Sequence, residues 1–183
     1  MILVACTLLF LGGDEEKRTS PQSALARELG SHAVKLSKAK GLAKRIEELA
    51  AVVSRLTEAL GAASQSSGRT EDSVVLSKLA LTLVDEGLVP RLREVSDDDP
   101  RNDAVYAGAV DAATRACDQA RAFAATLPED QRQRFQPNLD SAAPKVKRLS
   151  DWITERMARR DKPSNPGARG DRSPGAPDEV STP

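Results

Sequence analysis

The sequence predicts an all-α protein: an antiparallel bundle of three to five helices followed by a disordered C-terminal tail. Apolar residues recur with a period near 3.6 from about residue 20 to residue 160, without the two-residue alternation of strands. One tryptophan, one tyrosine and three phenylalanines are the only aromatic residues, so we expect an aliphatic core. Loops of about four to eight residues favour a bundle over an open solenoid.

The first segment, residues 1–19, begins with an apolar run. From Ile2 to Leu11 only Thr7 is polar, and two glycines and a charged block follow. Ten helical residues reach ~15 Å, half of the ~30 Å hydrocarbon core of a bilayer, so the run is too short to span alone. Its length is typical of the apolar core of a signal peptide, although no basic leader precedes it.

Within this run, Leu3-Val4-Ala5-Cys6 resembles the lipobox of bacterial lipoproteins, in which the cysteine is lipidated after cleavage before it. The resemblance implies that Cys6 is a lipidation site, while the residues after it stay apolar where lipoproteins turn polar. Three interpretations remain open: an ordinary export signal, a lipoprotein signal or other membrane anchor, and a buried apolar N-terminus of a cytoplasmic protein.

The clearest helical pattern is an apolar seam whose residues step by four, three, four, three and four: Leu42, Ile46, Leu49, Val53, Leu56 and Leu60. It predicts a helix from about Ser31 to Ala62, with the periodicity of a coiled coil. A short helix from Pro21 to Leu29, with Ser20 as N-cap and Gly30 as its stop, is expected before it.

A second long helix is predicted to begin near Thr70, with acidic residues at its positive end. Gly87 and Pro90 interrupt the pattern, and because proline lacks an N–H we expect a bend near Glu86. The expected buried stripe consists of Val75, Leu76, Leu79, Leu83, Leu88, Leu92 and Val95.

A third helix is predicted to begin at Asp99-Pro100 and to approach a neighbour closely, since its inner face is mostly alanine: Val105, Ala109, Ala112, Ala113, Ala116, Ala120, Phe123 and Ala124. A fourth unit begins at Pro128, is broken by Pro137 and Pro144, and resumes with the apolar positions Val146, Leu149, Ile153 and Met157, which Trp152 flanks. We assign residues 20–160 to the bundle. Residues 161–183, rich in proline, glycine and serine, are predicted to be disordered.

Composition argues against several classes of function. Lysine plus arginine and aspartate plus glutamate number 27 each, so the chain lacks the charge of a nucleic-acid-binding protein. It has no phosphate-binding glycine motif or serine nucleophile elbow. His32 is the only histidine, and Cys6 and Cys117 are far apart, so no metal-ligand pair is evident. We expect a non-enzyme without cofactor or metal that contacts a membrane only through its N-terminal segment.

One group of basic residues is a candidate site for an anionic ligand: Lys35, Lys38, Lys40, Lys44 and Arg45. The alternative is an ordinary solvated helix face. We expect an exported or membrane-tethered bundle that acts through contacts with an unknown protein partner or through self-association. A second hypothesis is an intracellular adaptor or oligomerisation domain, and a third is a periplasmic-type bundle that holds an anionic ligand on its basic helix.

Overall fold

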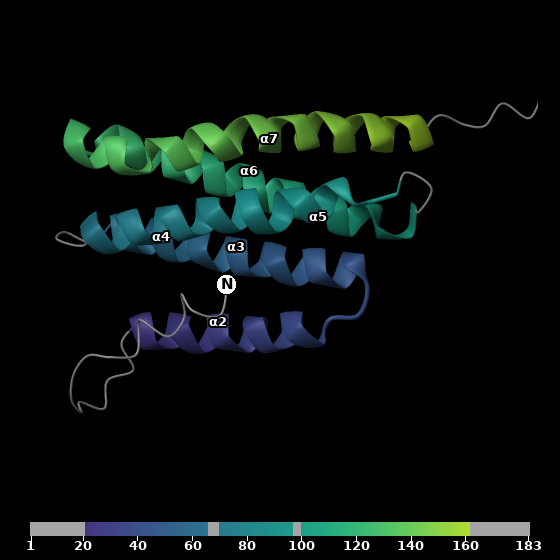
Figure 1. The fold of residues 1–183 in the computed structure, drawn as a ribbon, viewed down its shortest axis with the longest axis horizontal. Coiled ribbons are helices and arrows are strands. Elements are labelled where there is room, and N and C mark those ends of the chain that lie inside the picture. Colours follow the sequence, from purple (N-terminus) through teal and green to yellow (C-terminus); the bar gives the residue numbers. More distant parts are fainter. Residues whose placement is uncertain (1–20, 66–69, 97–99, 162–183) are drawn as a thin grey trace, which may run out of the picture.

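A computed structural model describes residues 21–65, 70–96 and 100–161, and these ranges contain helices and no strand. The helices form a bundle, as predicted, in which α2, α3, the continuous rod of α4, η2 and α5, then α6 and α7 run antiparallel in turn (Figure 1). The elements in chain order are α2 (Pro21–Lys38), α3 (Leu42–Ser64), α4 (Thr70–Thr82), the π-helical turn η2 (Leu83–Leu88), α5 (Val89–Arg93), the 3-10 turn η3 (Pro100–Asn102), α6 (Asp103–Thr126) and α7 (Glu129–Asp161).

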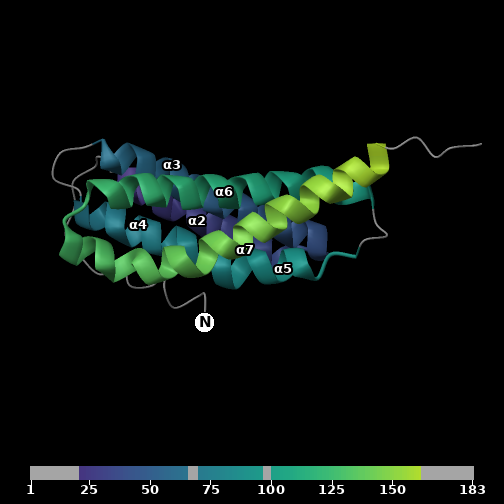
Figure 2. The same cartoon turned by 90° about the horizontal axis from the view of Figure 1, so that it is seen from above.

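Helix α3 lies at the centre of the bundle, in contact with α2, α4 and α6, and α7 packs on α6 and crosses it obliquely (Figure 2). The predicted seam of α3 is confirmed as core: Leu42 is half-buried, and the other members are buried, namely Ile46, Leu49, Val53, Leu56 and Leu60.

The predicted burial of the alanine-rich face of α6 is confirmed, and this face packs against α3. A Cβ added at Gly61 of α3 would lie 2.5 Å from the Gln119 side chain of α6, so the two helices approach closely there. Phe123 stacks on Phe135 of α7 with ring centroids 6.2 Å apart. Val105 is half-buried, and the alanines of the predicted face are all buried: Ala109, Ala112, Ala113, Ala116, Ala120 and Ala124.

The first two helices differ from the prediction of one helix from Ser31 to Ala62 preceded by a short one ending at Gly30. Helix α2 continues through Gly30 to Lys38, and the chain turns at Gly41. Gly30 is exposed, so it costs the helix only backbone entropy. Gly41 has φ +88° and ψ 157°, a conformation almost restricted to glycine, which places the turn there.

Helix α4 begins at Thr70 as predicted, but the predicted stripe is wrong at Val75, which is 54% exposed, and Leu79 is only half-buried. Leu76, Leu83 and Val95 are half-buried and pack against the core, and the predicted burial of Leu88 and Leu92 is confirmed. Small residues face the core instead, because they let α4 lie close to α3. The buried residues of this segment include Ser73, Ser77, Ala80, Leu81, Val84 and Gly87.

The irregularity expected near Glu86 is the π-helical turn η2. Pro90 has no N–H to offer the carbonyl of Glu86, and the N–H of Val89 reaches back five residues to Val84 O. The turn therefore absorbs one extra residue while Val84 and Leu88 both stay in the core.

The prediction that Pro137 and Pro144 break the last unit is wrong, because α7 is continuous across both. The two prolines are seven residues apart and therefore share one face, and both are exposed. The carbonyls that they leave without a donor belong to Gln133 and Asp140, which are also exposed, so water can satisfy them. The opposite face is an unbroken buried row: Phe135, Leu139, Ala142, Val146, Leu149 and Ile153.

The last apolar position predicted for this helix, Met157, is also wrong, since Met157 is 44% exposed while its neighbour Arg156 is 3% exposed. The apolar N-terminal segment with Cys6 lies outside the described residues, as does the predicted disordered tail beyond Asp161. No helix in the described ranges is both long and apolar enough to cross a bilayer.

Candidate functional site

The five basic residues predicted as an anion-binding patch lie on the last turns of α2, on the connection and on the first turn of α3. All five are exposed, and they gather at the end of the bundle where α2 turns into α3 (Figure 1). Lys44 donates to Glu47 at 2.8 Å, and Arg45 donates to the Ala39 carbonyl at 3.4 Å. The five residues therefore lie at one end of the bundle, and Lys44 and Arg45 are engaged in hydrogen bonds there.

Glu48 lies buried at the edge of this patch and is held by His32, whose Nδ1 is 3.0 Å from Glu48 Oε2. The hydrogen bond with His32 lowers the pKa of Glu48 against the opposing effect of burial, and the charges of Lys35 and Lys44 lower it further. This pair fastens α2 to α3. In the described ranges no group of three or more histidine, cysteine and acidic side chains is placed to hold a metal ion.

An open pocket of about 590 Å³ lies beside the patch, between the start of α3, the end of α5 and the start of α6. Of the five predicted basic residues, Lys40 and Lys44 line the pocket, and Lys35, Lys38 and Arg45 do not. The lining residues are Lys40, Gly41, Leu42, Ala43, Lys44, Glu47, Glu94, Ser96, Asn102, Val105 and Tyr106.

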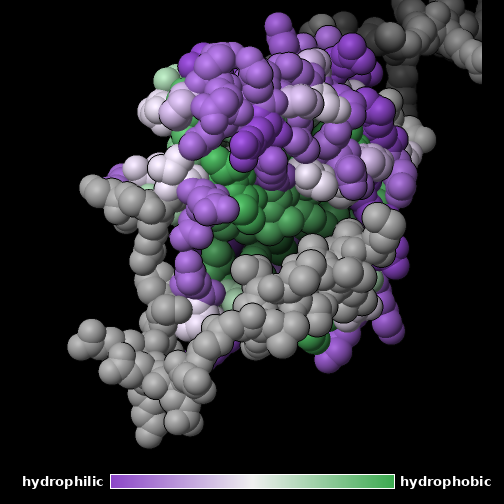
Figure 3. Space-filling view, turned by 60° about the vertical axis from the view of Figure 1, so that its left-hand side comes forward, coloured by the Kyte–Doolittle hydropathy of each residue, from purple (hydrophilic) through white to green (hydrophobic). Residues whose placement is uncertain are grey.

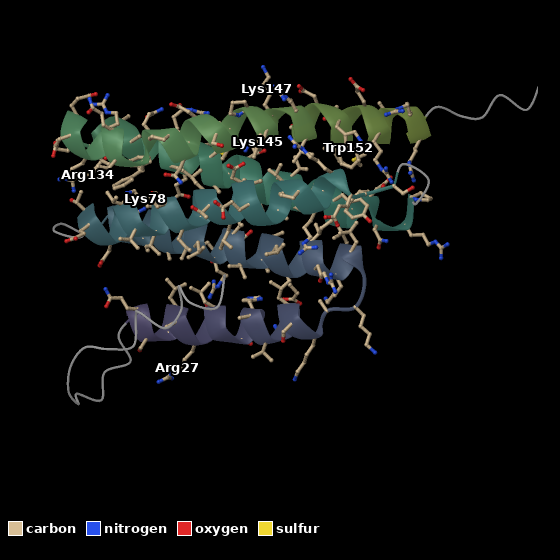
Figure 4. All side chains as sticks on the ribbon, viewed as in Figure 1. Arg27, Lys78, Arg134, Lys145, Lys147 and Trp152 are labelled. Carbon is tan, nitrogen blue, oxygen red and sulfur yellow. The ribbon has the colours of Figure 1, made fainter. Side chains whose placement is uncertain are left out.

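A second polar cluster, which sequence reasoning missed, joins η2 to α7. Ser141 Oγ donates to Asp85 at 2.7 Å, and Lys145 Nζ donates to Asp85 at 2.5 Å and to Ser141 Oγ at 3.1 Å. Lys145 lies on the side of α7 that faces the bundle, whereas Lys147 points away (Figure 4). Lys145 therefore contacts both the carboxylate and the hydroxyl of the cluster, and the three side chains tie η2 to α7.

The Asp85 cluster makes the stability of the bundle depend on pH. Burial raises the pKa of Asp85, but hydrogen bonds from Lys145 and Ser141 outweigh it, so the pKa lies below the usual 3.8. A lowered pKa in the folded state stabilises it above pH ~4, and this contribution disappears as the pH falls through the folded-state pKa. We expect Asp85→Asn to destabilise the protein at pH 7 and to cost much less at pH 2.5, as measured by urea unfolding at both values. An equal cost at both values would contradict this.

Arg156 forms a third polar site, at the other end of α7. Its Nε donates to Asp103 at 2.8 Å and its Nη1 donates to the Ser96 carbonyl at 3.0 Å. The guanidinium also lies 5.9 Å from the ring centre of Tyr106 and 5.4 Å from that of Trp152. Trp152 points from α7 toward α6 (Figure 4). The arrangement fixes the start of α6 against α7, and it also fixes the ring of Tyr106.

Cys117 lies in the core of α6 as a free thiol. Burial raises its pKa to about 11, so it is protonated at neutral pH. A protonated, buried thiol is a poor nucleophile and a poor metal ligand, and Cys117 serves packing.

Comparisons with known proteins add no family and no relative to this description. No family model matches the chain, and neither a curated protein nor a solved structure matches it.

Proposed function

We propose that this chain is a non-enzymatic helical-bundle protein that acts by binding another protein along α4. The observation that carries the proposal is that α4 buries small polar residues and exposes an apolar one. Ser73 and Ser77 are fully buried, whereas Val75 is 54% exposed. Two larger apolar residues on the other side of the helix form what we call the outer stripe of α4: the exposed Val75 and the half-buried Leu79.

The outer stripe has helical spacing, since Val75 and Leu79 are one turn apart. Leu76 and Leu83 lie beside them and pack against the core. An apolar side chain left exposed on one side of a helix is available to pack against the apolar face of a partner helix. In Figure 3, which brings forward the end of the bundle where α4 begins, hydrophobic residues reach the surface below a polar area.

Charge around the stripe indicates what partner fits. Glu71 and Asp72 precede it and Glu86 follows it, while Lys78 is the only basic residue of α4. A second copy would bring acidic ends against acidic ends in either orientation of the paired α4 helices. The fitting partner is a basic amphipathic helix whose apolar residues recur every three or four positions.

The experiment uses a fluorescent synthetic helix of leucine at that spacing with lysine at its polar positions. We expect it to bind the full chain, and Val75→Glu to weaken binding at least ~tenfold, a loss of about 1.4 kcal/mol. The matched control is Val34→Glu, because Val34 is equally exposed, at 52%, on α2. It should change the affinity less than ~twofold.

Three results would overturn the proposal: no binding of the lysine helix, an equal loss in both valine variants, or equal binding of a helix with glutamate in place of lysine. Sedimentation of the protein without the peptide tests whether a second copy of the chain occupies the outer stripe instead. A dimer that Val75→Glu dissociates would assign the outer stripe to a second copy instead.

We propose further that the protein is exported or tethered through its apolar N-terminal segment, with Cys6 as a candidate lipidation site and a cytoplasmic location as the alternative. The support is the apolar run from Ile2 to Leu11. Intact-mass measurement of native protein should show loss of about the first thirteen residues or a lipidated Cys6. A mass that retains Met1 without lipid would favour the cytoplasmic alternative.

A further inference from the structure

The first turn of helix α3, with its uncapped N-terminal end, lines the pocket beside the basic patch. No side chain caps this end, its N-cap is Gly41, and no acidic residue lies in its first turn. The first amides of a helix have no partner inside the helix. Those of Leu42, Ala43 and Lys44 take part in none of the turn and cap hydrogen bonds of the described ranges. They give the pocket a wall of donors with positive partial charge.

Tyr106 supplies an independent sign of a ligand on the opposite wall. It is 4% exposed and lines the pocket, yet its hydroxyl has no hydrogen-bond partner in the described part of the chain. The hydroxyl is not among the fully buried side-chain atoms without a partner in that part, which are Ser77 Oγ and Arg132 Nε, so it keeps some accessible surface for a ligand. The guanidinium of Arg156 packs over the tyrosine ring, 5.9 Å from its centre.

Charge in the pocket favours an anion. Lys40 forms no ion pair with any described residue. The two acidic residues of the lining are both paired, Glu47 with Lys44 at 2.8 Å and Glu94 with Arg91 at 3.9 Å. Among the described lining residues, Lys40 is therefore the charged group without an ion-pair partner, and the positive end of the α3 dipole lies beside it.

We propose that this pocket binds a small molecule through a phosphate group, held by the amides at the start of α3 and by Lys40 and Tyr106. These groups offer more donors than the two oxygens of a carboxylate need, and they match the three terminal oxygens and the double charge of a phosphate monoester. Leu42, Ala43 and Val105 form an apolar wall for its carbon skeleton. The volume of about 590 Å³ lies within the usual ~300–1,000 Å³ of small-molecule sites.

The test is a titration of the ¹⁵N-labelled full chain with inorganic phosphate and with phenyl phosphate at constant ionic strength. The amide signals of Leu42, Ala43 and Lys44 should shift and saturate, and phenyl phosphate should bind more tightly because it also covers the apolar wall. Lys40→Gln should raise the Kd at least ~fivefold and Tyr106→Phe at least ~threefold.

The matched control is Lys38→Gln, since Lys38 belongs to the basic patch but does not line the pocket. It should change the Kd less than ~twofold. An equal loss in the Lys38 and Lys40 variants would show diffuse attraction instead of a site, and shifts that are absent or never saturate would also overturn the proposal. Acetate binding as tightly as phosphate would overturn the choice of ligand. Thermal unfolding of each variant checks that it is folded, and Val75→Glu should leave phosphate binding unchanged, which separates this site from the outer stripe of α4.

Discussion

Leu49→Ala should lower the free energy of unfolding by ~2–5 kcal/mol. Leu49 is 4% exposed on the core face of α3, and its Cδ2 lies 3.7 Å from the point that a Cβ of Gly87 would occupy. Since Gly87 has no side chain to move into the vacated space, the cavity cannot be filled from η2. Urea unfolding followed by circular dichroism measures the loss.

The control for Leu49→Ala is Lys44→Ala on the same helix. The Lys44 side chain is half exposed, and its ion pair with Glu47 is on the surface, where such pairs are worth about 0–1 kcal/mol. Small and similar losses in both variants would mean that the α3 seam is not packed, and that result would contradict the bundle.

Periodicity predicted the core faces of the central helices correctly, because these faces consist of regularly spaced residues of one kind. The seam of α3 is aliphatic, and the inner face of α6 is alanine. Both patterns are recognisable in the sequence without knowledge of which helix packs against each face. The same reasoning predicted that the helices form a bundle, since two long apolar faces in a chain of this length must cover each other.

The same method failed on α4 because it ranks residues by hydrophobicity alone. The core side of α4 contains Ser73 and Ser77, which are chosen for size at a close approach to α3, and the more apolar Val75 faces outward. Which of two faces is buried depends on the distance to the neighbouring helix, and a single sequence does not contain that distance. The prediction that prolines break α7 failed for a related reason. The free energy that a proline costs a helix depends on whether the carbonyl four residues earlier is exposed to water.

Some residues of the candidate sites could be predicted from the sequence, and others could not. Lys40 and Lys44 stand out in the sequence as part of a basic run, and they do line the pocket. Tyr106 and the paired Glu94 come from helices far along the chain, so only the fold brings them to the start of α3. The Asp85 cluster has a weak local signal, because Ser141 and Lys145 are one helical turn apart, but their acceptor lies on another helix.

Arg156→Met should destabilise the protein by ~3 kcal/mol, because it removes the main partner of a carboxylate that stays at the helix interface. The Arg156 side chain is 3% exposed and that of Asp103 is 13% exposed. Methionine matches much of the arginine volume, so the loss reports the polar contacts more than a cavity. Arg160 remains 3.1 Å from Asp103 and keeps the loss below that of a fully isolated charge.

The matched control for Arg156→Met is Arg159→Met, a neighbour on α7 that is exposed and bonds only weakly, to the Glu155 carbonyl at 3.4 Å. It should change the free energy of unfolding by less than ~0.5 kcal/mol. The double variant with Asp103→Asn is the decisive measurement. If the buried pair is the cause, removing the carboxylate as well should recover part of the loss, because the carboxylate that lost Arg156 is then no longer charged. A double variant whose loss equals the sum of the two single losses would show that Arg156 acts through packing against Tyr106 and Trp152 and not through Asp103.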